Sequence, residues 1–204
     1  MMDDVTIDRR KLRTRRALRN ALLELVVTEG YDNLTVTDIT EHADLRRATF
    51  YLHYKSIDEL LAATLTHLMD DFVARLSEEA EQDATDPLPI PIEKDDTSET
   101  IAIFEYVAEH HTLYRALLNS HAGALVRHTI QTYLAQIKAR ELQALPQPLP
   151  MPIDIIANYI AGAKLTTITW WLDNDMPYTA YDMALMLQSL IHNGLQPLLQ
   201  RHRE

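Results

Sequence analysis

The 204-residue sequence contains no cysteine and only four glycines. Without cysteine the chain forms no disulfide bond and no thiolate metal site, which agrees with an intracellular setting. No uninterrupted apolar run approaches the roughly 18 residues of a membrane-spanning helix, and the first residues lack the apolar core of a signal peptide. We therefore expect a soluble cytoplasmic protein.

Charge is unevenly distributed along this chain, whose formal net charge is -11. Residues 1–60 hold ten Lys or Arg and eleven Asp or Glu, whereas residues 61–204 hold nine and nineteen. An early run of cations with no acid between them comprises Arg9, Arg10, Lys11, Arg13, Arg15, Arg16 and Arg19. Because a local field can oppose the overall sign, a polyanion can dock there. The simpler interpretation is a solvated helix face.

The scarcity of glycine and the spacing of apolar residues by three and four predict an all-helical fold. Leu18, Leu22, Leu25 and Val26 mark the buried stripe of a first helix. Gly30 follows, and we expect it to end this helix as a left-handed residue.

Two short helices are predicted next. Thr35 is placed to cap the first of them with Asp38 three residues on, and this helix should end near Ala43. The second should run through residues 46–54. Three short helices with a tight turn between the last two predict a helix-turn-helix.

Ser56 is placed to cap a long fourth helix, with Glu59 at the matching third position. Residues 83–99 and 146–152 are rich in proline and are predicted to be breaks. The remaining helices are expected at residues 98–119, with a break near the paired histidines, and at residues 121–145, 153–174 and 179–201. Residues 1–56 would then form the helix-turn-helix domain and residues 57–204 a helical domain for effector binding and dimerisation.

The segment "RRATFYLHYKS" at residues 46–56 gathers three aromatic rings, a histidine and two adjacent arginines. If Phe50 turns inward against Ile39, the other side of the helix is free to meet DNA. Arginine can pair bidentately with guanine, and alanine or leucine can touch a thymine methyl group. Hydroxyl groups and histidine rings can hold phosphates, which fixes register without reading sequence.

These residues resemble the N-terminal signature of the TetR family of bacterial transcriptional regulators. The similar stretch is "TVTDITEHADLRRATFYLHYKSIDELL", and its matching positions are Ile39, Ala43, Thr49, Tyr51, His53 and Leu60. The resemblance covers about residues 8–65. Asp44 stands in place of the usual glycine, Arg46 in place of the capping serine, and Ile57 in place of a phosphate-binding lysine. We expect Asp44 to take over the cap and Lys55 to substitute for the lysine.

Carried over by position, the resemblance implies roles for residues of the helix-turn-helix. Arg47, Ala48 and Leu52 are expected to face bases, with Arg46 close enough to add a contact through its charge. The residues expected at the phosphate backbone are Thr37, Thr49, Tyr51, His53 and, by substitution, Lys55. The resemblance further implies a repressor that a small molecule releases from DNA. We expect no cofactor.

Symmetric dimers that read two half-sites are the usual physical solution to finding one genomic site. The last two predicted helices could supply the dimer as a four-helix bundle. The apolar residues nominated for this face are Ile153, Ile156, Ala157, Ile160, Ala161, Gly162, Leu165, Ile168, Leu172, Ala184, Leu187, Leu190, Ile191 and Leu195. The alternative is that both faces are core within one chain.

An effector site needs apolar and aromatic lining. The candidates are Phe72, Phe104, Tyr106, His110, His111, Tyr114, Trp170 and Trp171, for each of which ordinary core packing is the competing interpretation. No residue pattern identifies the ligand.

Three other functions compete with DNA binding. A metal enzyme would use His110, His111, His121 and His128, but no H-E-x-x-H pattern exists and adjacent histidines point to different helix faces. A related interaction protein that has lost DNA binding is motivated by Ile57 and the acidity. A membrane-surface protein is disfavoured, because residues 9–19 lack an aromatic anchor.

Overall fold

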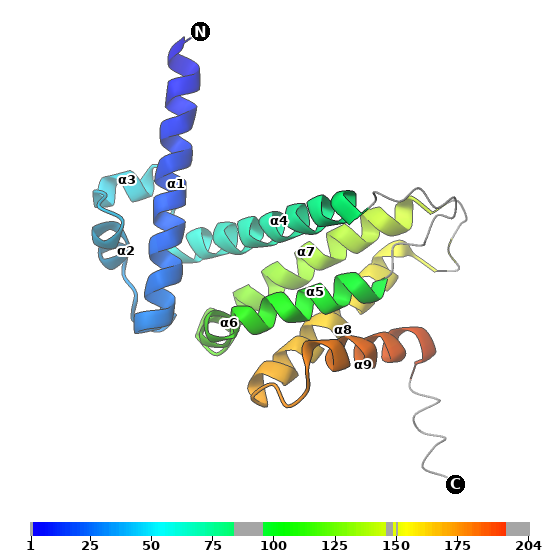
Figure 1. Cartoon of the computed structure of the whole chain (residues 1–204). Helices are drawn as coiled ribbons and strands as arrows, with labels where there is room; N and C mark the ends of the chain where they lie inside the picture. Colours follow the sequence, from blue (N-terminus) through cyan, green and yellow to red (C-terminus); the bar gives the residue numbers. More distant parts are fainter. Residues whose placement is uncertain (1, 84–95, 146–148, 150, 195–204) are drawn as a thin grey trace. The chain divides into compact units, whose positions relative to one another are not determined.

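The computed structural model describes residues 2–83, 96–145, 149 and 151–194, with side chains from residue 9 to 77 and from 97 onward within those ranges. All regular elements in these ranges are helical, as predicted (Figure 1). They are α1 (Met2–Glu29), the 3-10 turn η1 (Tyr31–Asn33), α2 (Val36–His42), α3 (Arg47–Tyr51), α4 (Ile57–Asp83), α5 (Asp96–Glu109), α6 (His111–Leu118), α7 (Gly123–Gln143), α8 (Ile153–Asp173) and α9 (Ala180–Asn193).

The chain packs as two compact units, which we describe separately. The first, named the DNA-reading unit after the role predicted for its helix-turn-helix, comprises Met1–Leu68 and Thr112–Thr129. The second, named the effector unit after the site predicted for it, comprises Met69–His111 and Ile130–Glu204. The DNA-reading unit thus includes α6 and the start of α7 as well as the segment before residue 56.

Buried side chains of α1, α2 and α3 contribute to the core of the DNA-reading unit. Leu18 and Leu22 of α1, Ile39 of α2 and Phe50 of α3 are fully buried, as the sequence pattern predicted. Gly30 ends α1 with φ 79° and ψ 141°, a positive φ as expected but an extended rather than left-handed ψ. This conformation turns the chain directly into η1.

The turn between α2 and α3 confirms part of the local prediction and corrects another part. Thr35 and Asp38 form the expected capping box, and Asp44 supplies a positive φ of 53°. However, α3 begins with Arg46 as N-cap, and none of the described side chains caps it. The prediction that Asp44 caps α3 was therefore wrong, because Asp44 lies in the turn with its side chain in solvent.

Helix α4 begins with a different set of bonds from the predicted capping box. The Glu59 backbone N–H donates to Ser56 Oγ at 3.1 Å, as expected. The Glu59 carboxylate, however, accepts from the backbone N–H of Lys55 at 2.6 Å, one residue earlier than a capping box requires. Both bonds still satisfy backbone donors at the helix start.

The effector unit is organised around α5, α8 and α9. Helix α5 packs against α9, and α8 also contacts α9. Phe104 and Trp171 meet edge to face at 5.3 Å between ring centroids. Lys164 of α8 is buried and pairs with Glu99 of α5 at 3.4 Å.

Most helix boundaries here agree with the sequence. The break between α5 and α6 falls at the paired histidines, as predicted. Helix α5 begins at Asp96, inside the segment predicted to be a loop, and α9 ends at Asn193. The break predicted at residues 146–152 lies mostly outside the described residues, as does the predicted continuation of α9 beyond residue 194.

The apolar face nominated for dimerisation is largely core. Ala157, Ala161, Leu165, Ile168 and Leu172 are buried within the chain, as are Ala184 and Leu187. Ile153, Ile156, Ile160, Leu190 and Ile191 are half-buried, and Leu195 lies outside the described residues. The buried members of this set are core within one chain, and the half-buried members stay candidates for the interface.

Candidate nucleic-acid interface

The short helix α3 presents most of its side chains to solvent. Within this fully described helix only Phe50 is buried, and it anchors α3 to Ile39 and the rest of the core. The exposed side chains around it are Arg46, Arg47, Ala48, Tyr51 and Leu52. Leu52 is 82% exposed, which is unusual for a leucine within a folded unit.

Arg47 and Tyr51 interact along the exposed side of α3. Arg47 Nη2 donates to the Tyr51 hydroxyl at 3.3 Å, and the guanidinium lies 5.7 Å from the ring centroid. Tyr51 itself rests edge to face on Phe50 at 5.4 Å between centroids. A chain of contacts from the core thus limits the conformations of Arg47, which lowers the entropy cost of a bidentate contact.

The residues predicted to hold phosphates lie on α2, on α3 and in the segment between α3 and α4. Thr37 on α2 and Lys55 before α4 are exposed, while Thr49 and His53 are half-buried. The pKa of His53 is lowered, first by burial and then by the positive charges of Arg15 and Lys11 on α1. His53 therefore favours its neutral form beside the cationic side of α1.

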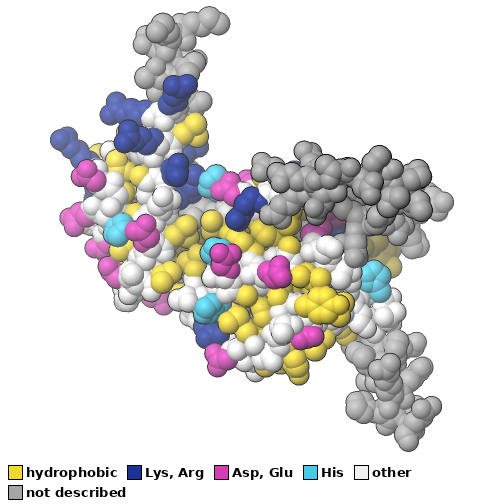
Figure 2. All heavy atoms as spheres, in the orientation of Figure 1, with side chains coloured by type: hydrophobic (Ala, Val, Ile, Leu, Met, Phe, Trp, Pro, Cys, Tyr) yellow, Lys and Arg dark blue, Asp and Glu magenta, His cyan; other side chains and the backbone are white. Residues whose placement is uncertain are grey.

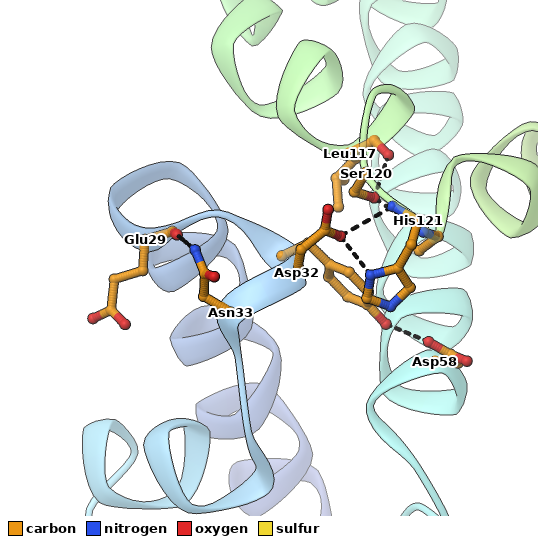
Figure 3. Close-up of polar contacts among 9 residues, drawn as sticks. Glu29, Asp32, Asn33, Asp58, Leu117, Ser120 and His121 are labelled. Carbon is orange, nitrogen blue, oxygen red and sulfur yellow. Dashed lines mark hydrogen bonds and ion pairs between the residues drawn. The ribbon is translucent and has the colours of Figure 1, made fainter.

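A polar cluster connects three segments of this unit (Figure 3). No sequence pattern predicted it. The Tyr31 hydroxyl donates to Asp58 at 2.5 Å. Asp32 pairs with His121 Nδ1 at 2.6 Å and accepts from the His121 backbone N–H at 3.0 Å. These contacts tie η1 to α4 and to the turn before α7. No local pattern could have revealed them, because Asp32 and His121 are 89 residues apart in the sequence.

The Tyr31 ring is almost fully buried, and this burial is the largest cause of the shift in its pKa. Burial, then the hydrogen bond to Asp58 and the charge of that carboxylate, raise the pKa of Tyr31 well above its usual range. The phenol therefore stays neutral and remains a hydrogen-bond donor in the folded unit.

The candidate effector residues fall into separate groups. Phe72, Tyr106 and His110 form one half-buried cluster, with centroid distances of 4.7 Å from Phe72 to Tyr106 and 4.4 Å from Tyr106 to His110. Arg75 lies 5.4 Å from the centre of the Tyr106 ring. This cluster joins aromatic surface to a cation within the effector unit.

The other candidates occupy different surroundings. Phe104 and Trp171 are core residues, and Tyr114 is buried in the DNA-reading unit. Trp170 is 48% exposed and stacks on Tyr178 at 6.5 Å between ring centroids. His111 Nδ1 lies 2.9 Å from the backbone oxygen of Ala108.

Within the described residues, no group of three or more His, Asp or Glu is arranged to hold a metal ion. His121, one of the histidines weighed as a ligand, is engaged with Asp32. Across the same residues, the helices are all too short or too polar to cross a bilayer.

Two family sequence models match this chain. The model described as "Bacterial regulatory proteins, tetR family" matches residues 18–64, which contain the helix-turn-helix. The model described as a transcriptional regulator C-terminal region of the TetR type matches residues 95–193.

Curated relatives include two proteins of Bacillus subtilis. The uncharacterized HTH-type transcriptional regulator YxbF is 39% identical over 72 residues, which cover 35% of this chain and only 19% of that relative. The fatty acid metabolism regulator protein is 21% identical over 187 residues, which cover 86% of this chain and 92% of that relative.

Solved structures share the fold along most of the chain. A TetR transcriptional regulator of Streptococcus agalactiae superposes with a TM-score of 0.62 at 19% identity, covering 92% of this chain and 98% of that one. The regulator FadR of Bacillus subtilis, solved with stearoyl-CoA, gives a TM-score of 0.60 at 18% identity and covers 88% and 98%.

Proposed function

Because the chain belongs to the TetR family of bacterial transcriptional regulators, we propose that it is a homodimeric repressor released from a palindromic operator by a small molecule. DNA reading is assigned to residues 1–56, and effector binding and dimerisation to residues 57–204. The observation that carries this proposal is the pair of exposed, mutually ordered side chains Arg47 and Tyr51 on a helix anchored by Phe50.

Sequence reading is assigned to the exposed side of α3. Arg47, Ala48 and Leu52 would meet base edges, since all three are exposed and one can pair bidentately with guanine. Thr37, Thr49, Tyr51, His53 and Lys55 would meet phosphates, with Arg46 adding charge beside them. Phosphate contacts position the helix, and base contacts give it specificity.

Selection of bound fragments from random duplex DNA tests this assignment. We expect a palindromic sequence whose affinity falls steeply with salt. Arg47→Ala should weaken the selected site by about 1 to 3 kcal/mol and relax preference at one base pair in each half-site. Arg140→Ala, an exposed arginine of the effector unit, is the control with the same change in charge. Failure to enrich any duplex at low salt would overturn the proposal.

Dimerisation is assigned to the apolar side chains that α8 and α9 leave exposed. On α8 these are Ile155, Tyr159 and Trp170, and on α9 they are Tyr181, Leu185 and Met186. Ile155 and Tyr159 lie four residues apart on one face of α8, and they are 59% and 61% exposed. A second copy of the chain is the proposed partner, since large exposed apolar side chains gathered on neighbouring helices mark an interface.

Sedimentation of variants tests whether this exposed face forms the dimer. Tyr159→Glu should yield monomers and remove the preference for palindromes over single half-sites. Val73→Glu, at another exposed apolar residue of the effector unit, should leave the mass unchanged. A dimer that survives both Tyr159→Glu and Leu185→Glu would remove these helices from the interface.

Effector binding is assigned to the cluster of Phe72, Tyr106 and His110 with Arg75. Aromatic surface beside a cation suits a ligand with an apolar chain and an anionic group. FadR of Bacillus subtilis was solved with stearoyl-CoA, so fatty acyl-CoA thioesters are the first ligands to test. Such a ligand releases DNA if it favours the DNA-incompetent arrangement by a few kcal/mol.

Titration of the protein–operator complex with acyl-CoAs of increasing chain length provides the readout. Release of DNA by the wild type and reduced sensitivity of Tyr106→Ala, at unchanged DNA affinity, are the expected results. If every acyl-CoA leaves the complex intact while the palindrome is bound, the ligand class is wrong and the DNA-binding assignment stands.

A helical interaction protein without specific DNA binding is the second candidate. Its specific support is Ile57, half-buried where the TetR family signature usually has a phosphate-binding lysine. Under this alternative, a variant with Arg47→Ala and Tyr51→Phe would keep its full effect in cells.

A further inference from the structure

The N-terminal part of α1 extends beyond the segment that the family model matches. That model begins at residue 18, whereas α1 begins at Met2. The preceding turns carry six exposed cations, namely Arg9, Arg10, Lys11, Arg13, Arg15 and Arg16. Figure 1 shows this part of α1 continuing past α3, and Figure 2 shows Lys and Arg side chains gathered there. Nothing in the family match assigns a role to these residues.

Two of the cations continue the line of side chains that packs α1 into the unit. Lys11, Arg15, Leu18 and Leu22 are spaced by four, three and four residues, so they lie on one helix face. Leu18 and Leu22 are fully buried, whereas Arg15 and Lys11 are exposed. The face that holds α1 to the helix-turn-helix therefore becomes cationic where the core ends.

This cationic face adjoins the reading surface. The charges of Arg15 and Lys11 act on His53, which follows α3 directly, and contribute to its lowered pKa. Electrostatic effects of exposed charges fall off within about 10 Å at ordinary ionic strength. Arg15 stands one turn before the buried Leu18 on the same helix face, and Figure 1 shows α3 beside this stretch of α1, so Lys11 and Arg15 lie toward the surface formed by Arg47, Tyr51 and His53.

We propose that Lys11 and Arg15 form a second DNA contact, in which this face of α1 binds backbone phosphates adjoining the half-site that α3 reads. The proposal rests on the proposed function for its DNA partner. Lys11 and Arg15 are four residues apart, or about 6 Å along the helix, which suits neighbouring phosphates of one strand. Only Leu12 is a large exposed apolar side chain among the described residues of this stretch, so an anionic membrane is the poorer partner.

The same helix offers a matched control. Arg9 and Arg16 are seven residues apart and share a face, and Arg16 lies two residues from Leu18, which puts that face opposite the core. The variants Lys11→Gln with Arg15→Gln, and Arg9→Gln with Arg16→Gln, remove equal charge from the same helix. They differ in the face that loses it.

Binding of each variant to a labelled duplex across a salt series tests the proposal. The slope of log affinity against log salt should fall by about 0.9 for each phosphate that the variant no longer neutralises. We expect this fall for Lys11→Gln with Arg15→Gln, equally on operator and unrelated duplexes, and a smaller change for Arg9→Gln with Arg16→Gln. Circular dichroism should show α1 intact in both variants.

Equal slopes for the two double variants would overturn the proposal, since the run would then act only through its total charge. Loss of binding to phosphatidylserine vesicles, with duplex binding unchanged, would assign the face to a membrane instead. The salt slope can be measured on any duplex. A wild type that selects no operator therefore refutes the proposed function, while the difference between the two variants still decides this inference.

Discussion

Thr35 and Thr179 begin helices with the same capping box in the two units, yet the helices they begin serve different surfaces. In the DNA-reading unit, the helix after Thr35 supports α3, whose side chains are mostly exposed. In the effector unit, α9 buries Met183, Ala184 and Leu187 in the core. Local signals thus predict exposure well on a short helix that buries a single side chain, and poorly on long helices that carry apolar residues on several sides.

The largest difference between the two units is expected when a core phenylalanine of each is replaced by alanine. Phe50→Ala and Phe104→Ala should each cost about 3 to 5 kcal/mol, because both side chains are fully buried. The chain has two tryptophans, Trp170 and Trp171, and both lie in the effector unit. Tryptophan fluorescence during urea unfolding therefore reports that unit alone. Phe104→Ala should lower its midpoint, and Phe50→Ala should abolish DNA binding with the fluorescence transition retained.

Equal shifts of the tryptophan transition in both variants would break this comparison. The two units would then unfold as one cooperative body.

The capping boxes give the next largest expected effect. Thr35→Ala and Thr179→Ala should each destabilise their unit by about 1 kcal/mol, because a backbone N–H at the helix start loses its acceptor. Only Thr35→Ala should weaken DNA binding at protein concentrations where the dimer is saturated, since α2 supports α3. Hydrogen exchange of α2 and α9 measures the local loss, with Thr35→Ser and Thr179→Ser as controls that keep the hydroxyl.

Alkaline pH should destabilise each unit through one tyrosine with a raised pKa. Tyr31 donates to Asp58 and Tyr133 donates to Asp70, and burial together with the carboxylates raises both pKa values. A raised folded-state pKa means that the stabilisation is complete below the ordinary tyrosine value of 10.0 and is lost as pH rises above it. Tyr31→Phe should cost about 0.5 to 1.5 kcal/mol at neutral pH.

The same variant should remove part of the alkaline loss from the DNA-reading unit. Circular dichroism follows that loss, while tryptophan fluorescence follows the effector unit, where Tyr133→Phe should act. Identical pH profiles for wild type and Tyr31→Phe would show that the phenol is not protected as described.

The smallest effect is expected at the exposed pair of Asp32 and His121. Both side chains are more than half exposed, so the ion pair should contribute no more than about 1 kcal/mol. A double-mutant cycle with Asp32→Asn and His121→Gln measures the coupling, which should shrink in high salt. Coupling above that limit would show that the turn before α7 depends on this pair for its position.

Some local features of the DNA-reading unit were predictable to the level of single residues. The capping box at Thr35 and the inward position of Phe50 follow from local rules and are present. The spacing of Thr179 and Asp182 obeys the same capping rule, so this box too is a local feature. By contrast, Leu165 was nominated for the dimer face of α8 and is buried in the core, while the exposed Tyr159 was not nominated.

The sequence by itself determined the all-helical class, the helix-turn-helix and the side chains that α3 presents, because capping, turn conformation and apolar spacing act over a few residues. Only the tertiary structure decided which apolar face of α8 and α9 is core and which aromatic residues form one cluster. It alone brought Asp32 to His121 and buried Lys164 beside Glu99. Those outcomes depend on which segments, far apart in the chain, exclude water from one another, and no local pattern encodes that choice.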